Sequence, residues 1–287
     1  MAFGKLGGDE LNYSSDIDLL AIYEPDDTIA DQEHRLGKLF RQVVRDLTDF
    51  TVEGQAYRVD LRLRPWGNAG RLVYSIPTLE RYYAEEADLW ELQALLKLAP
   101  VAGDVELGRT FMRTMKPVLA RRGERAGRTA ILQTVRRLRA RAVQEHDAAP
   151  DEAGSVVGAD IKNGEGGIRD VEFLVQALQM LHQRLSPEII TGNTLSALQR
   201  LEEAGILSND KVAALRADYL FLRRIEHFLQ VYDDRQLHAI PAEQEAQEKL
   251  TRVVLGEGAR PEDLLRRLET TLQRVRADYV GVITPEQ

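Results

Sequence analysis

Hydrophobic periodicity divides this sequence near Thr78, and the division limits the folds that it can adopt. Before Thr78, the stretches "DIDLLAIYE" and "QAYRVDLRLRP" alternate polar and apolar residues, as half-buried strands do. Between them, "DQEHRLGKLFRQVVRDLTDF" has apolar residues at helical spacing. Beyond Thr78 the strand patterns nearly vanish, and long segments have helical spacing instead. We predict helices at 104–121, 127–147, 168–184, 192–204, 209–237 and 261–282.

These patterns predict the fold class α+β, with an α/β domain at 1–103 and an all-α helical bundle at 104–287. The segment 146–167 collects Gly, Ala, Pro, Asp and Ser, so it is predicted to be a loop. If Gly4 ends a strand, only three residues precede it, whereas strands average about 5–6 residues. We therefore expect a fragment of a longer polypeptide, whose upstream part completes the first strand.

Composition excludes several classes of protein. A chain of 287 residues with 44% apolar residues, 29% charged residues and a net charge of -8 is expected to be soluble and acidic, which disfavours bulk nucleic-acid binding. Nothing in the sequence resembles a signal peptide or an apolar run long enough to span a membrane. Because it has no cysteine, disulfides, thiolate zinc sites and cysteine nucleophiles are excluded, and we expect a cytoplasmic protein.

The stretch "GKLGGDELNYSSDIDLL" (4–20) contains two aspartates, Asp16 and Asp18, whose spacing places both carboxylates on one face of a strand. Two hard oxygen ligands suit Mg²⁺, although most such pairs are solvated turns or caps. The two glycines permit a tight turn with amides free for a phosphate, and the serines add hydroxyl donors. The lysine of this stretch can reach a phosphate or lie exposed in a loop. The candidate phosphate-binding residues here are Lys5, Gly7, Gly8, Ser14 and Ser15.

A third carboxylate, Asp60, lies between apolar residues in the middle of the predicted strand "YRVDLRLRP". A carboxylate in a half-buried strand needs a partner, so it is either a third ligand or salt-bridged to Arg58 or Arg62. Alternation predicts that Arg62 and Arg64 share the face of Asp60. Their forked donors suit phosphate oxygens, and charge balance around the aspartates is the alternative.

The three aspartates and the glycine turn resemble the DNA-polymerase-β-type nucleotidyltransferase superfamily. More closely, "GKLGGDELNYSSDIDLL", "YRVDLRLRPWGNAGRLV", "GGIRDVEFLVQALQ" and "YLFLRRIEHFLQ" resemble, in that order, the glutamine synthetase adenylyltransferase/adenylyl-removing enzymes. The resemblance implies a nucleotidyltransferase domain with a mixed sheet, followed by helices. That family carries two similar halves, one attaching AMP to a tyrosine of glutamine synthetase and the other removing it by phosphorolysis. The chain resembles one half.

The sequence contains features that resemble each of the two halves of that family. Asp170 and "WELQAL" (90–95) resemble the C-terminal, transferring half. Features of the N-terminal, adenylyl-removing half outnumber them, and we favour that half. They are Arg58, Trp66, Arg169 and the stretch "FLRRIE" at 221–226.

The resemblance implies that Asp16 and Asp18 bridge two Mg²⁺ ions, and that Asp60 holds the ion that activates the nucleophile. The nucleophile is phosphate for removal and the tyrosine hydroxyl for transfer. Lys162 and Glu172, in "DIKNGEGGIRDVEF", are implied as parts of the active-site wall, although acidic residues in a first helical turn often only complement the helix dipole. The implied partners are glutamine synthetase, ADP or ATP, phosphate and, as a regulator, a PII-type nitrogen-signalling protein.

Two other features favour no site. The five histidines have no metal-ligand spacing, so zinc and haem are not supported. A basic stretch is either a solvated helix face or a docking surface for an acidic protein. It comprises Arg121, Arg122, Arg125, Arg128, Arg136, Arg137, Arg139 and Arg141.

Two other functions compete with an enzyme acting on glutamine synthetase. A nucleotidyltransferase acting on a small molecule is opposed by the long motif match and by the large helical part. A regulatory half without chemistry is opposed by the three aspartates, because a degenerate site has no reason to keep three close like charges.

Overall fold

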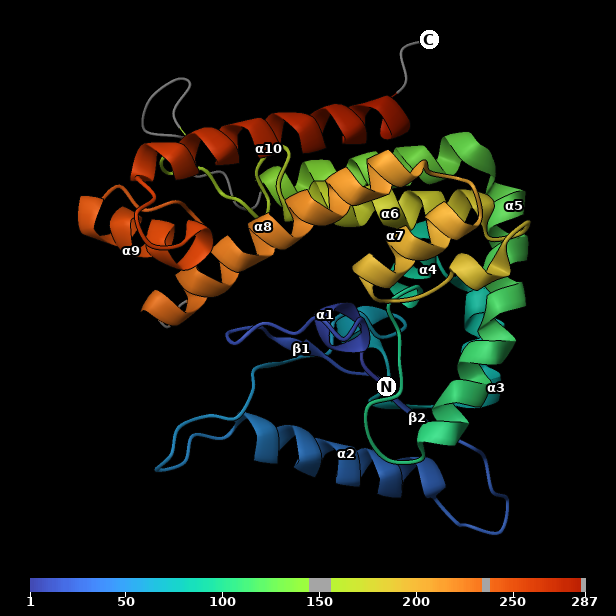
Figure 1. Cartoon of the computed structure of the whole chain (residues 1–287). Helices are drawn as coiled ribbons and strands as arrows, with labels where there is room; N and C mark the ends of the chain where they lie inside the picture. Colours follow the sequence, from blue (N-terminus) through green and yellow to red (C-terminus); the bar gives the residue numbers. More distant parts are fainter. Residues whose placement is uncertain (145–155, 234–237, 285–287) are drawn as a thin grey trace. The chain divides into compact units, whose positions relative to one another are not determined.

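The computed structural model describes residues 1–144, 156–233 and 238–284, and these residues form two compact units. Unit 1 comprises Met1–Arg128 and Gln179–Ala197, and unit 2 comprises Thr129–Leu178 and Leu198–Gln287. Figure 1 shows the elements of each unit. The predicted boundary between 103 and 104 lies inside unit 1, because residues of the following helix up to Arg128 belong to that unit.

Unit 1 contains short strands paired in parallel. Strand β1 pairs with β3, and β2 pairs with β4. Ala2 adds antiparallel bridges to Leu19 and Ala99, so both pairing directions occur. The described strands confirm an α+β fold, and they are β1 (Ile17–Asp18), β2 (Ala21–Tyr23), β3 (Val59–Asp60) and β4 (Val73–Ser75).

The predicted helix at 31–50 is confirmed as α2 (Gln32–Thr48), which lies beside the strands in Figure 1. Phe40 and Leu47 of α2 pack against Ala2, Ile17 and Leu19, which are buried. The apolar spacing of α2 therefore serves to cover one side of β1. The other helical segments of unit 1 outside the long helices are α1 (Gly4–Gly7), η1 (Gly67–Ala69), α3 (Ile76–Arg81), the π-helical η2 (Tyr82–Glu86), α4 (Leu89–Leu95) and η3 (Pro187–Ile189). Sequence analysis did not predict the helices between 76 and 95.

The predicted helices of the second part are confirmed in type. The break predicted between 121 and 127 lies at Gly127 of α5, whose φ of 77° belongs to the left-handed region that glycine adopts most readily. The predicted helix ends at 147 and 237 lie outside the described residues, as do residues 146–155 of the predicted loop 146–167, which include His146. The rest of that loop, 156–167, contains no helix or strand, as predicted. No described helix is long and apolar enough to cross a membrane. The observed helices are α5 (Val105–Gln144), α6 (Ile168–His182), α7 (Thr194–Glu203), α8 (Asn209–Asp233), α9 (Gln244–Leu255), which was not predicted, and α10 (Pro261–Ile283).

The basic stretch on α5 is not a uniformly solvated face. Arg122 donates hydrogen bonds to the carbonyl oxygens of Tyr83 and Ala87 in unit 1. In unit 2, Arg139 is buried and donates to the carboxylate of Asp170 and, over 2.9 Å, to the carbonyl oxygen of Gly164. The interpretation as a solvated face is therefore wrong for these two arginines, because each supplies donors that buried acceptors need.

The buried pair Arg139–Asp170 generates a stability prediction for unit 2. Replacing Arg139 by Met should lower the free energy of unfolding by about 3–5 kcal/mol, because the Asp170 charge stays buried after its main partner is removed. The matched control is Arg136→Met on the exposed face of α5, for which we expect a change within about 0.5 kcal/mol. Urea denaturation of both variants measures the difference, and equal effects would contradict a structural role for Arg139.

Candidate functional site

The pairing of β1 with β3 brings two of the predicted aspartates together. Asp18 and Asp60 are register partners on neighbouring parallel strands, which lie about 4.7–4.9 Å apart in a sheet. Asp16 lies just before β1 and outside the strand. Ile17 separates the two aspartates and Leu19 follows them, and both are buried in the core of unit 1. The structure therefore places Asp18 beside Asp60, with Asp16 next to the start of the same strand.

Two of these carboxylates are held by arginines. Arg58 Nε lies 2.5 Å from Asp16 Oδ1, and its Nη2 donates to the carbonyl oxygen of Ser14 over 2.8 Å. Arg62 Nη2 lies 2.6 Å from Asp60 Oδ2, and the Arg62 backbone amide donates to Asp60 Oδ1 over 2.8 Å. The salt bridge to Arg62, left open by the sequence, is thus present in this structure.

Electrostatics link Arg62 to all three aspartates. Burial acts to raise the pKa of Asp60, but the hydrogen bonds from Arg62 outweigh it, and the pKa is lowered from its usual value. The pKa of Arg62 is raised, first by its hydrogen bond to Asp60 and also by the charges of Asp18 and Asp16. The guanidinium of Arg62 therefore lies in the combined field of the three carboxylates, where a cation is favoured.

The predicted strand through "LRLR" is wrong, because β3 ends at Asp60 and the chain turns. Arg62 is exposed and reaches Asp60 through this turn, whereas Arg64 is buried. Arg64 Nη1 donates to the carbonyl oxygen of Leu61 over 2.8 Å, and its Nε has no hydrogen-bond partner among the described residues. The two arginines do not share a strand face by alternation. A role for either in binding phosphate stays a prediction.

The glycine turn also differs from expectation. Residues 4–7 form the helical turn α1, so the amides of Gly7 and Gly8 donate to the carbonyl oxygens of Phe3 and Gly4, over 3.1 and 3.0 Å. The amides predicted to be free for a phosphate are therefore used within the chain. A Cβ at Gly7 would lie 2.0 Å from the carbonyl oxygen of Lys97, so the glycine is required for close packing.

Gly4 brings α1 against Asp18. Its φ is +60°, and a Cβ there would lie 2.8 Å from Asp18 Oδ2. Only glycine combines this backbone conformation with such a close approach to the carboxylate. Lys5 is partly buried in α1, and Ser14 and Ser15 are partly buried in the turn that precedes Asp16.

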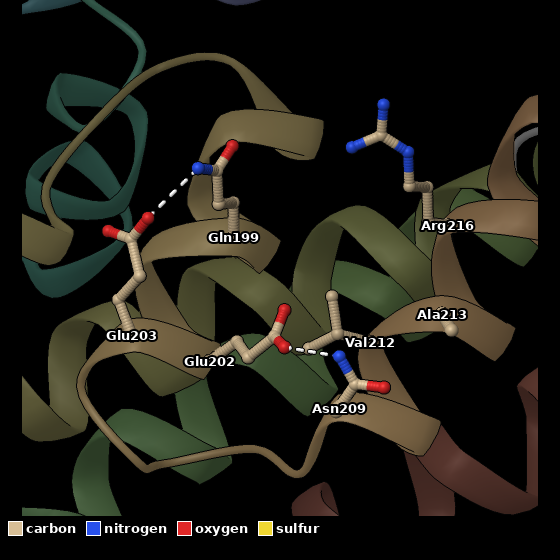
Figure 2. A pocket seen from close by; sticks show the side chains of 7 residues that line it. All are labelled: Gln199, Glu202, Glu203, Asn209, Val212, Ala213 and Arg216. Atoms are coloured by element: carbon tan, nitrogen blue, oxygen red, sulfur yellow. Dashed lines mark hydrogen bonds between the residues drawn. The ribbon is translucent and has the colours of Figure 1, made fainter.

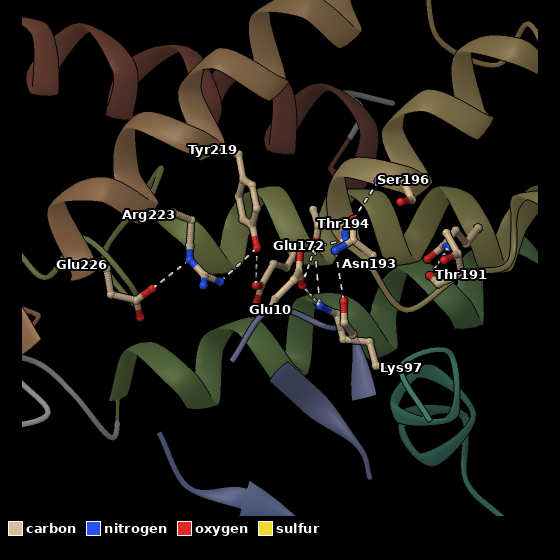
Figure 3. Close-up of polar contacts among 12 residues, drawn as sticks. Glu10, Lys97, Glu172, Thr191, Asn193, Thr194, Ser196, Tyr219, Arg223 and Glu226 are labelled. Carbon is tan, nitrogen blue, oxygen red and sulfur yellow. Dashed lines mark hydrogen bonds and ion pairs between the residues drawn. The ribbon is translucent and has the colours of Figure 1, made fainter. Parts of the chain in front are cut away.

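Sequence analysis missed Glu10, which anchors this turn. The Glu10 carboxylate lies 2.6 Å from Lys97 Nζ and accepts hydrogen bonds from the Thr194 amide and hydroxyl, over 2.9 and 3.1 Å (Figure 3). Asn193 Nδ2 donates to the carbonyl oxygen of Gly8 over 3.1 Å. An acidic residue two positions after Gly8 was a visible signal, but its partners are distant in sequence. Glu10 and Lys97 form a largely buried ion pair that fixes the glycine turn.

The remaining predicted site residues lie in unit 2, and both contact α8. Lys162 Nζ is 3.4 Å from Glu226 Oε1, and Glu172 Oε1 accepts a hydrogen bond from Tyr219 Oη over 3.2 Å. Glu172 is buried and Lys162 is partly buried.

A hollow of about 460 Å³ on unit 2 contains none of the predicted site residues (Figure 2). Its polar groups bond one another, with Gln199 Nε2 donating to Glu203 over 2.9 Å and Asn209 Nδ2 donating to Glu202 over 2.6 Å. We assign no chemistry to it.

The fit to a metal ion is incomplete. Carboxylate oxygens are the ligands that Mg²⁺ prefers. However, no three His, Asp or Glu side chains in the described ranges are grouped so that they hold a metal ion. Asp16 and Asp60 engage Arg58 and Arg62 instead. The donor chemistry suits magnesium, and an ion at Asp16 or Asp60 would have to displace Arg58 or Arg62 from the carboxylate.

Comparison with known proteins identifies relatives along nearly the whole chain. Residues 1–114 match the family described as glutamate-ammonia ligase adenylyltransferase, and residues 133–280 match the family described as GlnD PII-uridylyltransferase. The bifunctional glutamine synthetase adenylyltransferase/adenylyl-removing enzyme of Stenotrophomonas maltophilia (strain R551-3) is 37% identical over 299 residues, covering 99% of this chain and 30% of the relative.

Proteins of the same name from other bacteria are also similar to this chain. The one from Thioalkalivibrio sulfidiphilus is 39% identical over 255 residues, which is 87% of this chain and 25% of the relative. The one from Bifidobacterium longum is 33% identical over 306 residues, which is 98% of this chain and 28% of the relative. The chain thus spans less than a third of the length of these relatives.

The close packing of α1 generates a prediction about its glycines. Gly7→Ala should lower the free energy of unfolding by about 3 kcal/mol or more, since the new Cβ overlaps the carbonyl oxygens of Lys97 and Ala2. The matched control is Gly37→Ala in α2, where a Cβ meets no atom within 4 Å. That variant should gain roughly 0.5–1 kcal/mol from helix propensity. Thermal melts of both report the signs, and a stable Gly7→Ala variant would disprove the packing role.

Proposed function

Because this chain belongs to the glutamine synthetase adenylyltransferase family, we propose that it removes AMP from an adenylylated tyrosine of glutamine synthetase by phosphorolysis. The observation that carries the proposal is the in-register pair Asp18–Asp60, with Asp16 just before the same strand, in a chain similar to these enzymes over nearly its whole length. Neighbouring carboxylates can hold divalent ions, and such ions neutralise the negative charge that develops on the attacking and leaving oxygens in phosphoryl and nucleotidyl transfer.

The proposed reaction is a displacement at the adenylyl phosphorus. An oxygen of inorganic phosphate forms a bond to that phosphorus, and the bond to the tyrosine oxygen breaks. The tyrosine oxygen leaves and takes up a proton, and the products are ADP and unmodified glutamine synthetase. Negative charge builds on the attacking and leaving oxygens, so the reaction needs cations beside the phosphorus.

The chain's own cations supply part of this compensation in the proposal. Arg62 is exposed beside Asp60, and its planar fork suits a phosphate that approaches the aspartates. Arg64 is buried and donates a hydrogen bond to the carbonyl oxygen of Leu61 in the turn, and its Nε is a further donor. The full proposal includes two Mg²⁺ ions, which Asp16, Asp18 and Asp60 would hold. These ions would neutralise the part of the negative charge on the attacking and leaving oxygens that the arginines do not. In unit 2, Lys162 and Glu172 are proposed substrate-binding residues.

The wider assignment rests on the same relatives. We propose that the strand-containing part has a polymerase-β-type nucleotidyltransferase fold. We further propose that the chain is the adenylyl-removing half of a longer cytoplasmic enzyme, and that a PII-type signalling protein is among the regulators of that enzyme. The match of residues 133–280 to a family described by PII uridylylation supports the last point only by its name. The resemblance of Arg58, Trp66, Arg169 and "FLRRIE" supports removal over transfer.

The second candidate is transfer of AMP from ATP to glutamine synthetase, in which the tyrosine hydroxyl attacks and pyrophosphate leaves. The stretch "WELQAL" and Asp170 favour it. Asp170 is buried, where it accepts hydrogen bonds from Arg139 and from the Gly166 amide, so its position serves the structure of unit 2. That contact weakens its value as a mark of the transferring half.

An activity assay separates the two directions. With Mg²⁺ and phosphate, the chain should release ADP from adenylylated glutamine synthetase, and Asp18→Asn should lower the rate by about a hundredfold or more. The control Asp27→Asn, at an exposed turn of unit 1, should retain the parent rate. ATP-dependent labelling of unmodified glutamine synthetase without a phosphate requirement would show that the chain is the transferring half.

The arginine pairs predict competition for magnesium. Arg62 occupies oxygens of Asp60 that a metal ion needs, so Arg62→Ala should bind Mg²⁺ about fivefold more tightly in the absence of phosphate. The control Arg71→Ala removes an equally exposed arginine, paired with Glu33 of unit 1, and should leave Mg²⁺ affinity unchanged. Calorimetric titration with MgCl₂ measures both. An unchanged Mg²⁺ affinity in Arg62→Ala would show that Asp60 is not a ligand of the ion.

A further inference from the structure

One face of α8 carries polar residues at helical spacing. Tyr219, Arg223, Glu226 and Gln230 follow at i, i+4, i+7 and i+11, which places them along one stripe of the helix. All four are buried in unit 2. A buried polar stripe on a helix of this length is costly, because each group must be desolvated.

Glu226 is the centre of the stripe and is fully buried. Three basic side chains surround its carboxylate: Lys162 Nζ at 3.4 Å, Arg223 Nε at 3.3 Å and His238 Nδ1 at 3.9 Å. A fully buried carboxylate persists as an ion only with such partners. The position of the Lys162 ammonium is therefore set largely by Glu226.

Tyr219 contacts Glu172, the other predicted site residue of unit 2, through its hydroxyl. Its hydroxyl donates to Glu172 Oε1 over 3.2 Å and accepts a hydrogen bond from Arg223 Nη1 over 3.3 Å (Figure 3). Arg223 thus joins the hydroxyl of Tyr219 to the carboxylate of Glu226. One continuous chain of polar contacts runs from Glu172 to Lys162 through three residues of α8.

Stability alone does not account for this network. Well-packed apolar side chains usually stabilise a core as well as a buried ion network does, and often better. Gln230 of the same stripe has both amide atoms buried without a hydrogen-bond partner among the described residues, which is a further cost. A buried polar group without a partner calls for an explanation, and a functional role is one such explanation.

We propose that Tyr219 and Glu226 are positioning residues, which hold the Glu172 carboxylate and the Lys162 ammonium in fixed places for substrate. The inference rests on the proposed role of Lys162 and Glu172 in binding substrate, and it adds the residues that orient them. An ammonium donates to phosphate oxygens and a carboxylate accepts from hydroxyls, so the ligand class is a molecule with both groups, as in a nucleotide.

The sharpest test removes one oxygen atom. Tyr219→Phe deletes the hydrogen bond to Glu172 and keeps the ring. We expect about tenfold weaker binding of ADP by calorimetry, because a hydrogen bond to a charged group has been lost, and a melting temperature lowered by a few degrees, because the Glu172 carboxylate is buried. The matched control is Tyr279→Phe on α10. Tyr279 is 3% exposed against 2% for Tyr219, and its hydroxyl has no hydrogen-bond partner among the described residues. It should bind ADP as the parent does.

A double-mutant cycle distinguishes positioning from a general structural effect. If Tyr219 acts through Glu172, Tyr219→Phe should have little further effect on ADP affinity in a Glu172→Gln background. Glu226→Gln should likewise have little further effect once Lys162 is replaced by Met. If Glu226→Gln does not fold, the Tyr219 cycle still decides the matter.

Two results would overturn the inference: equal ADP affinity in Tyr219→Phe and Tyr279→Phe, or additive effects in the Tyr219–Glu172 cycle. Turnover of adenylylated glutamine synthetase, measured on the same variants, separates this inference from the proposed function. A parent that binds ADP but neither removes nor transfers AMP would fail the proposed function, while the binding cycle would still test the positioning role.

Discussion

The in-register pairing of β1 with β3 is the constraint on which the candidate site depends. It aligns Asp18 with Asp60 and buries Ile17 between flanking aspartates, so a one-residue slip would exchange core and site positions. Close carboxylates repel, and Arg58 and Arg62 offset that repulsion in this structure. The strands are very short, so the register is held from outside them, by α2 on the core side and by the backbone of residues 1–3.

Elements with a long, regular apolar repeat could be predicted from the sequence. Helices α2, α6, α8 and α10 all have such a repeat. Phe40 and Leu47 of α2 are partly buried against the strands, whereas most residues of α6 are buried. The end of β3 could not be predicted, because the alternation in "LRLR" continues past the point where the strand stops. A contact from outside the turn fixes the chain that follows, since the Tyr74 hydroxyl donates to the carbonyl oxygen of Pro65 over 2.7 Å. The next residue, Trp66, adopts a φ of 57°.

The candidate site was predictable in its residue types and not in its contacts. Asp16 and Asp18 were selected by their spacing along one strand, and Asp60 by its position between apolar residues of the next strand. The glycines were predicted to leave amides free for a phosphate, whereas those amides bond within α1. The neighbour of Gly7 is the backbone of Lys97, which is distant in sequence. Glu10 was missed for the same reason, since its partners Lys97 and Thr194 are distant in sequence.

The Asp16–Arg58 pair of unit 1 and the Glu226 network of unit 2 hold their charges in different ways, and the difference follows from burial. In unit 1 the Asp16 and Arg58 side chains are 42% and 49% exposed, so water can replace either partner and the ion pair is weak. Such carboxylates can exchange an arginine for another cation. In unit 2 the Glu226 side chain is fully buried, and its partners cannot leave without stranding a charge in the core. Exchangeable carboxylates suit the binding and release of ions, whereas a fixed network suits the orientation of groups that must not move.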